Sequence, residues 1–205
     1  VVPSLAGDAG AVGRLAELVG LGVEVSHPAV LSVIDLVREG DALFVVTDLV
    51  DAAALRTVMQ RARAESLVLA PHVVVAILVG LLDALSATHE ALGRDGKARP
   101  HGAVSPATVL LGVDGVVRLL DAGASMVAEA ALGADAPHVV AYKAPEQKRG
   151  QVGVPSSDLF AVGVIGWEML TGGALFLGGD VDETRRRVEQ QLVQPPSRLR
   201  PELPK

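Results

Sequence analysis

The stretch from His101 to Leu110 constrains the fold of this chain most, because small and polar residues there separate two strongly apolar regions. Before it, the run Val73–Leu82 carries no polar side chain and is roughly half of the ~20 residues that a membrane-spanning helix needs. We therefore predict a buried helix over Pro71–Leu92 and no membrane-spanning segment in this chain. After it, the dipeptide Asp114-Gly115 stands between two short apolar runs, a pattern typical of a β-hairpin.

The residues before the long helix predict further helices and strands. Ala29–Val37 and Ala42–Asp48 are rich in Val, Leu and Ile and are joined by a short polar turn, which indicates two β-strands. Asp8–Gly22 has apolar residues at helical spacing after a capping Asp, and a short helix is expected near Ala52–Arg63. Near the other end, Asp182–Val193 also predicts a helix.

Composition limits the classes of protein that fit. A chain of 205 residues can form one large domain or two small lobes. Half of the residues are apolar but only 2% are aromatic, so the core must consist of Val, Leu and Ala. The absence of cysteine excludes disulfides and thiolate metal sites, and it favours a cytoplasmic location. The net charge of -6 argues against a nucleic-acid partner.

A series of short motifs in the second half of the chain carries a family resemblance. Val104, Ser105 and Pro106 are followed by Ala144-Pro145-Glu146 and then by the helical pattern Ser157–Gly172. In this order and spacing they resemble the catalytic loop, the end of the substrate-binding segment and the following buried helix of bacterial serine/threonine protein kinases. The family's loop reads His-Arg-Asp, two residues, Pro, one residue, Asn. The resemblance runs from about residue 8 to about residue 200.

The resemblance implies an α+β protein-kinase-like fold with two parts. Residues 1–50 would be the remnant of the small lobe, with the regulatory helix, two strands and the hinge, and residues 51–205 a mainly α-helical large lobe. Kinases begin with a glycine-rich hairpin over the phosphates and a strand whose lysine holds them. The first lysine here is Lys97, and Gly20 and Gly22 are typical of a helix stop. We therefore expect a kinase domain that is truncated at both ends.

The residues that catalyse phosphate transfer in the family are replaced. Ala103 stands at the position of the catalytic Asp, and Thr108 at that of the metal-binding Asn. Gly102 replaces the arginine between His and Asp, and Leu18 stands where the regulatory helix has a glutamate. The chain contains no Asn at all. Because phosphoryl transfer depends on positioning and on charge stabilisation, these losses predict that the domain transfers no phosphate.

The resemblance to kinases also implies that some nucleotide-binding positions are retained. Thr47 would lie at the back of the nucleotide pocket, Asp48 and Val50 would belong to the hinge, and Leu110 would lie under the adenine ring. Asp121 matches the metal-binding Asp of the family's Asp-Phe-Gly motif. ATP and Mg²⁺ are therefore the implied cofactors, although without the lysine we expect weak or no ATP binding.

Three polar residues are expected to support the fold. His101 should pack and form hydrogen bonds behind the loop, and Asp158 should cap its helix and hold the loop backbone. Glu146 corresponds to a residue that pairs with an arginine from the last helices of the large lobe. Tyr142 is expected to be a packing residue.

Three classes of function remain open from the sequence. The first is a pseudokinase that binds a protein partner, either an active kinase or another domain of a longer chain. The second is an active serine/threonine kinase that uses Asp121 and a replacement carboxylate such as Asp114 or Asp135. The third is a structural module that binds no nucleotide. A glycine-rich hairpin and a lysine upstream would favour nucleotide binding over a purely structural role.

Overall fold

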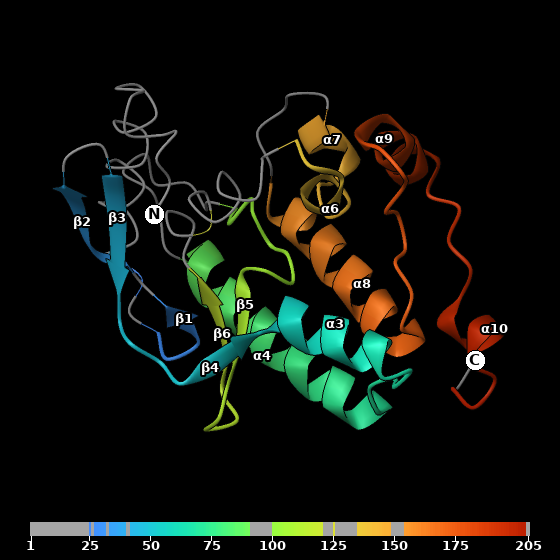
Figure 1. The fold of residues 1–205 in the computed structure, drawn as a ribbon, viewed down its shortest axis with the longest axis horizontal. Helices are drawn as coiled ribbons and strands as arrows, with labels where there is room; N and C mark the ends of the chain where they lie inside the picture. Colours follow the sequence, from blue (N-terminus) through green and yellow to red (C-terminus); the bar gives the residue numbers. More distant parts are fainter. Residues whose placement is uncertain are drawn as a thin grey trace.

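The computed structural model describes residues 25, 27–31, 33–39, 42–90, 100–120, 125, 135–148 and 154–203. Its first elements are strands, and its last are helices (Figure 1). The helix predicted over Asp8–Gly22 lies outside the described residues.

Six strands form two separate sheets. They are β1 (Val30–Leu31), β2 (Val33–Glu39), β3 (Ala42–Thr47), β4 (Ala52–Ala54), β5 (Val109–Gly112) and β6 (Val117–Leu120). The larger sheet has the order β1-β6-β5-β4, with β1 parallel to β6 and the other neighbours antiparallel. The smaller sheet is the antiparallel pair β2 and β3, which lies at one end of the molecule (Figure 1).

The predicted strand over Ala29–Val37 is divided between the two sheets. Val30 pairs with Leu119 in the larger sheet, whereas Val33 pairs with Thr47 in the smaller one. The prediction of one continuous strand was therefore wrong. Its first residues pair with β6, which lies far along the chain, and a local apolar pattern carries no information about that pairing.

The predicted hairpin after the loop is present as β5 and β6. Leu111 pairs with Val117, and Gly115 adopts a positive φ of 79° in the turn between the strands. Glycine tolerates this conformation without strain, which is why Asp114-Gly115 is a reliable local signal.

Seven described helices cover the rest of the chain. They are α3 (Leu55–Ala64), α4 (Pro71–Glu90), α6 (Pro137–Val140), α7 (Pro145–Lys148), α8 (Pro155–Thr171), α9 (Val181–Gln190) and α10 (Pro196–Leu199). The helix expected near Ala52–Arg63 begins later, because Ala52–Ala54 pair with β5 instead. At α9, Asp180 accepts a hydrogen bond from the backbone N–H of Glu183 at 2.7 Å and so caps the helix.

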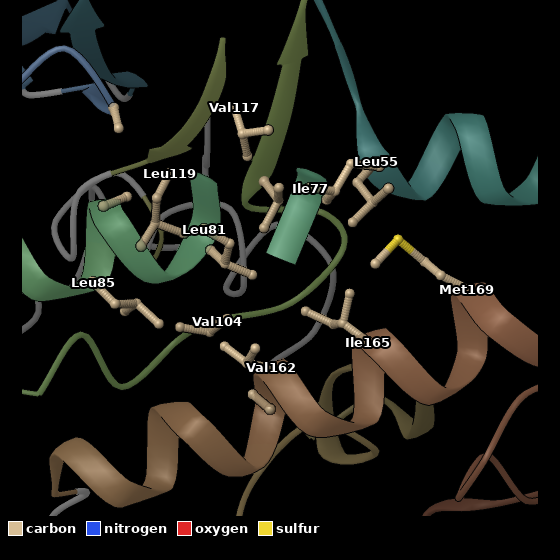
Figure 2. Close-up of a cluster of buried hydrophobic side chains, with 14 of the residues drawn as sticks. Leu55, Ile77, Leu81, Leu85, Val104, Val117, Leu119, Val162, Ile165 and Met169 are labelled. Atoms are coloured by element: carbon tan, nitrogen blue, oxygen red, sulfur yellow. The ribbon is translucent and has the colours of Figure 1, made fainter. Parts of the chain in front are cut away.

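The main core lies where α4 packs against α8 and β6 (Figure 2). Leu81 of α4, Leu119 of β6 and Ile165 of α8 are fully buried in it. The backbone of α4 approaches β6 closely at Gly80, where an added Cβ atom would lie 2.8 Å from the Cβ atom of Val117. The core is aliphatic, as the composition predicts, with Ile and Met alongside Val, Leu and Ala.

Helix α4 is buried on one face only. Val74 and Ile77 belong to the core, whereas Val75 and Val79 are exposed, so the prediction of a buried helix was correct for one side alone. Among the described residues, α4 is also the one helix whose length and mean hydropathy of 1.8 would suit a membrane span. Its packing against α8 and β6 accounts for the helix within this domain.

Two neighbouring leucines of α4 test this packing. Leu81→Ala should lower the free energy of unfolding by about 2–5 kcal/mol, because it leaves a cavity at a side chain that is 0% exposed. Leu82→Ala should lower it by less than about 1 kcal/mol, because Leu82 is 41% exposed. Urea unfolding curves measure both losses. Equal losses would contradict the orientation of α4 seen here.

Candidate functional site

The loop from Ala103 to Thr108 is held closed by the Thr108 side chain. Thr108 is fully buried, and its hydroxyl oxygen accepts a hydrogen bond from the backbone N–H of Ser105 at 3.0 Å. The carbonyl oxygens of Ala103 and Ser105 each lie 3.0 Å from the hydroxyl oxygen of Thr108, and either can accept its proton. A hydroxyl has one proton to donate, so its donor and one acceptor lone pair are engaged within the loop. Thr108 therefore serves the backbone of the loop.

Ala103, which was predicted to correspond to the catalytic Asp, carries only a methyl group. Ala103 is buried, and its backbone N–H donates to Nδ1 of His101 at 3.3 Å. Alanine offers no group that could accept a proton from a hydroxyl substrate.

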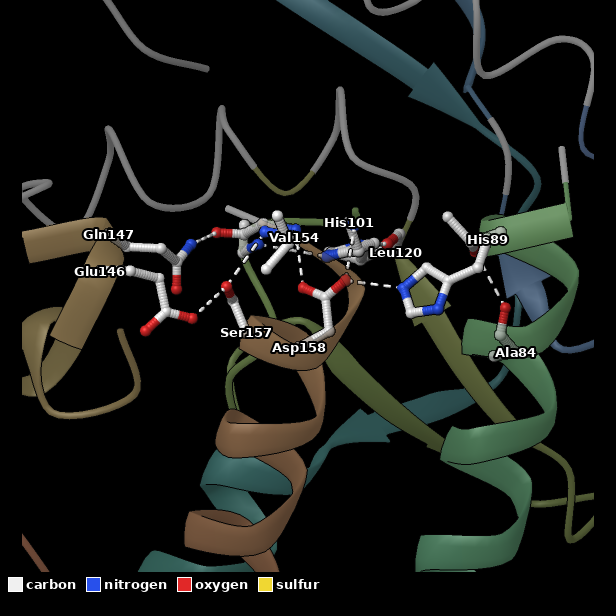
Figure 3. A network of polar contacts seen from close by, with 12 residues as sticks. Ala84, His89, His101, Leu120, Glu146, Gln147, Val154, Ser157 and Asp158 are labelled. Atoms are coloured by element: carbon white, nitrogen blue, oxygen red, sulfur yellow. Dashed lines mark hydrogen bonds and ion pairs between the residues drawn. The ribbon is translucent and has the colours of Figure 1, made fainter. Parts of the chain in front are cut away.

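A buried carboxylate joins the loop to two helices (Figure 3). Asp158 of α8 is 2% exposed, and it accepts hydrogen bonds from the backbone N–H groups of His101 and Gly102, each at 2.8 Å. Nε2 of His89, in the last turn of α4, lies 2.7 Å from the same carboxylate. Three partners therefore compensate the burial of this charge.

His89 was not predicted as part of the site. The described residues contain no cluster that could hold a metal ion, so His89 has a structural contact there and no metal-binding one. Its contact with Asp158 joins residues 69 positions apart, so no local pattern could have revealed it.

His101 lies behind the loop. Its Nε2 atom is 2.6 Å from the carbonyl oxygen of Leu120, which can only accept, so Nε2 carries the proton. Nδ1 is then the acceptor for the backbone N–H of Ala103. The Ser125 hydroxyl also donates to the Leu120 carbonyl, at 3.1 Å. These contacts tie the loop to the end of β6.

Asp158 does not cap its helix, so that prediction was wrong. Helix α8 begins at Pro155, which places Asp158 inside the first turn with its carboxylate directed to the loop. The cap is formed by Ser157, whose hydroxyl oxygen accepts the backbone N–H of Val154 at 3.0 Å. The same hydroxyl donates to Glu146 at 2.6 Å, which fixes α7 against the start of α8.

Gly102 stands where the family has an arginine, and its backbone is left-handed with φ 77°. Its carbonyl oxygen accepts hydrogen bonds from the Lys143 ammonium at 2.9 Å and from the Gln147 side chain at 3.0 Å. Glycine adopts this conformation readily. The loop is thus fixed from both sides, by Asp158 and by residues around α7.

The predicted nucleotide contacts lie around the two sheets. Thr47 ends β3, and its hydroxyl donates to the carbonyl oxygen of Asp48 at 3.3 Å. The segment containing Asp48 and Val50 then connects β3 to β4 without regular structure. Leu110 is half-buried in β5, opposite Ala54 of β4. Asp121, the predicted metal ligand, lies outside the described residues.

Comparison with known proteins decides the family. Residues 15–203 match the family described as protein kinase domain. The chain belongs to the protein kinase family. This confirms the kinase-like α+β fold that the motifs suggested.

Its curated relatives are bacterial serine/threonine kinases. PknL of Mycobacterium tuberculosis is 32% identical over 157 residues, which are 75% of this chain and 37% of PknL. PkaB of Streptomyces coelicolor is 31% identical over 182 residues, covering 83% of this chain and 41% of PkaB. PknA of M. tuberculosis is 30% identical over 189 residues, covering 88% and 41%. The chain therefore spans about two fifths of the length of these relatives.

A second buried acid lies below the loop. The Tyr142 hydroxyl donates to Glu168 at 2.8 Å, and the backbone N–H of Leu175 donates to the other carboxylate oxygen at 2.9 Å. Burial raises the pKa of Glu168, and burial together with the Glu168 charge raises the pKa of Tyr142. Tyr142 is thus both a packing residue and a hydrogen-bond donor.

Removing the Asp158 charge should destabilise the domain. Asp158→Asn should lower the free energy of unfolding by roughly 3–5 kcal/mol, because an amide cannot serve all the donors that surround it. Asp135→Asn is the control, since Asp135 is 87% exposed in its ion pair with Arg185 and should contribute less than about 1 kcal/mol. Urea unfolding measures both. Similar losses for the two variants would show that the Asp158 network is not a major support of the fold.

Burial of Glu168 should make stability pH-dependent. The folded pKa lies above the ordinary value of 4.5, so the neutral acid stabilises the fold below that value and the contribution is lost as pH rises through the folded pKa. The stability of the native chain relative to Glu168→Gln should therefore fall as the pH rises above about 4.5, because the carboxyl group is then ionised in the unfolded chain before it is ionised in the folded one. Urea unfolding of both proteins below and above this pH measures the difference. A difference that does not change with pH would contradict the assignment.

Proposed function

We propose that this chain is a pseudokinase domain that binds a protein partner and transfers no phosphate. The observation that carries the proposal is the set of hydrogen bonds between the Thr108 hydroxyl and the backbone of its own loop. Together with the methyl group of Ala103, this leaves the loop without a general base and without a metal ligand at the two positions where the family has them.

The physical cost of these changes supports the absence of transfer. A single general base contributes about 10²–10⁴ in rate, and charge stabilisation by bound metal ions contributes further. The contacts that hold the loop, from Asp158 and His101, are nevertheless retained. A frame that keeps its shape after losing its reactive groups suits recognition better than catalysis.

The proposal extends to the ligands and partners. Kinases use ATP and Mg²⁺, and we propose that nucleotide binding here is weak or absent, with Thr47, Asp48, Val50 and Leu110 as the adenine contacts and Asp121 as the metal ligand. The partner would be an active kinase or another domain of a longer chain, in the cytoplasm. The division at the hinge into residues 1–50 and 51–205 is part of the same proposal.

The alternative of an active kinase needs a replacement carboxylate, and both candidates are engaged elsewhere. The Arg118 guanidinium lies 2.6 Å from Asp114 in the β5–β6 turn and lowers the pKa of Asp114 to about 2. Asp135 forms an exposed ion pair with Arg185 of α9 at 3.2 Å. Neither observation favours a catalytic role.

Two measurements on this protein test the proposal. With radiolabelled ATP and Mg²⁺ or Mn²⁺, we expect no phosphate transfer to itself or to a general protein substrate above the level of the Asp121→Asn variant. Thermal melting with increasing ATP would separate a nucleotide-binding pseudokinase, which shows a concentration-dependent rise, from a purely structural one, which shows none.

Transfer that is present in the native protein and abolished by Asp121→Asn would overturn the proposal. Asp182→Asn is the matched control, because it removes an exposed carboxylate of α9 outside the loop. If Asp135→Asn abolished transfer as well, Asp135 would be the replacement base of the alternative function.

A further inference from the structure

A pocket of about 230 Å³ lies below the loop, between α3, α6 and α8. The loop residues Ser105, Pro106 and Ala107 form part of its wall. Most of its polar lining groups are cationic or hydrogen-bond donors, and they come from three helices and the segment after α6: Arg56, Gln60, Arg63, His138, Tyr142 and Glu168. The volume is below the roughly 300–1,000 Å³ of small-molecule and cofactor pockets, so it suits a single side chain.

Arg56 offers an unpaired guanidinium to this pocket. Its backbone N–H donates to the carbonyl oxygen of Pro106 at 2.7 Å, which fixes the start of α3 under the loop. Its side chain is half-buried and forms no hydrogen bond or ion pair within the described part of the chain. A guanidinium in this position is a strong donor to a carboxylate or a phosphate, which it binds through two parallel hydrogen bonds.

His138 supplies a second unsatisfied group. Its Nε2 atom is buried and has no hydrogen-bond partner among the residues that the structure describes. Buried polar nitrogens normally have a hydrogen-bond partner, so Nε2 is a group that a ligand of this pocket would satisfy. Burial, and then the charge of Arg56, lowers the pKa of His138, so the Arg56 guanidinium is close enough to the imidazole to act on its charge.

The charges decide which ligand fits. Glu168 is the one acid in the lining, and its two oxygens already accept from Tyr142 and from the backbone of Leu175. Arg63 donates through Nε to the carbonyl oxygen of Gly172 at 2.7 Å but keeps its charge. An entering cation would meet two guanidinium groups, whereas an anion would find unpaired donors.

We infer that this pocket binds an anionic side chain, a carboxylate or a phosphate monoester, presented by a peptide segment of the partner protein. The inference deepens the proposed function and rests on it for the identity of the ligand as a protein. The anion would receive hydrogen bonds from Arg56 and from Nε2 of His138, and the loop wall at Pro106 would exclude water from one side.

Peptide titration of the full 205-residue chain tests the inference. Three blocked hexapeptides serve as probes: one of glutamate, one of glycine and serine with a central phosphoserine, and one of lysine. Binding is followed through the imidazole proton signals of His138 in NMR spectra, assigned with His138→Gln. We expect an anionic peptide to bind and to raise the pKa of His138, and the lysine peptide not to bind.

Two arginines of α3 provide matched variants. Arg56→Gln should weaken binding of the anionic peptide at least tenfold, because it removes a charged hydrogen-bond donor. Arg61→Gln should change the affinity less than twofold, because Arg61 is 82% exposed and pairs with Glu65 outside the pocket. Arg56→Lys keeps the charge and should recover part of the affinity. Thermal melting of each variant verifies that it folds.

The outcomes separate this inference from the proposed function. Binding of the glutamate peptide supports a carboxylate ligand, and binding of the phosphoserine peptide alone supports a phosphate ligand. Binding of neither, binding of the lysine peptide, or equal effects of Arg56→Gln and Arg61→Gln would overturn the inference. Phosphate transfer with peptide binding would leave the pocket standing and the pseudokinase proposal refuted. If neither phosphate transfer nor peptide binding is found, the pseudokinase proposal stands and the inference about the pocket is refuted.

Discussion

The buried carboxylate of Asp158 is the interaction on which the arrangement of this domain depends. A charge at this depth is tolerated only because backbone N–H groups of the loop and a histidine of α4 all turn toward it. Those donors in turn fix the position of the loop relative to α4 and α8, the two helices that form most of the core with β6. A polar contact thus aligns helices whose apolar faces alone would specify only that they pack together.

The loop therefore has a scaffold that does not depend on its reactive groups. Asp158 and His101 hold the backbone on one side, and Lys143 and Gln147 hold the Gly102 carbonyl on the other. The Thr108 hydroxyl accepts a hydrogen bond from the Ser105 backbone inside the loop. In a protein kinase, such a frame positions the catalytic residues. In this chain the same contacts hold a loop with Ala103 and Thr108 at the positions predicted to correspond to the catalytic Asp and the metal-binding Asn, so the frame does not require those two groups.

Features governed by neighbours in the sequence could be predicted, and those governed by distant pairings could not. The β5–β6 hairpin follows from Asp114-Gly115, because the turn itself requires the conformation that glycine adopts. The correspondence of Ala103 and Thr108 to the family's Asp and Asn rests on motif spacing alone and stays a prediction. The division of the first strand, the strand β4 formed by three alanines, and the contact of His89 with Asp158 all depend on partners that the fold brings together. The pocket lined by Arg56 and His138 could not be predicted from the sequence either, because the two residues are far apart in the chain.

The engagement of Thr108 has a consequence for how such a domain evolves. Restoring Asn at this position would introduce a larger side chain into a fully buried site and would remove the hydroxyl that now satisfies Ser105. Restoring Asp at Ala103 would place a carboxylate where a buried methyl group now packs. Each reversal is unfavourable before the other has occurred. In the pseudokinase proposed above, either substitution alone would therefore be unfavourable, and a return to catalysis would need both changes together.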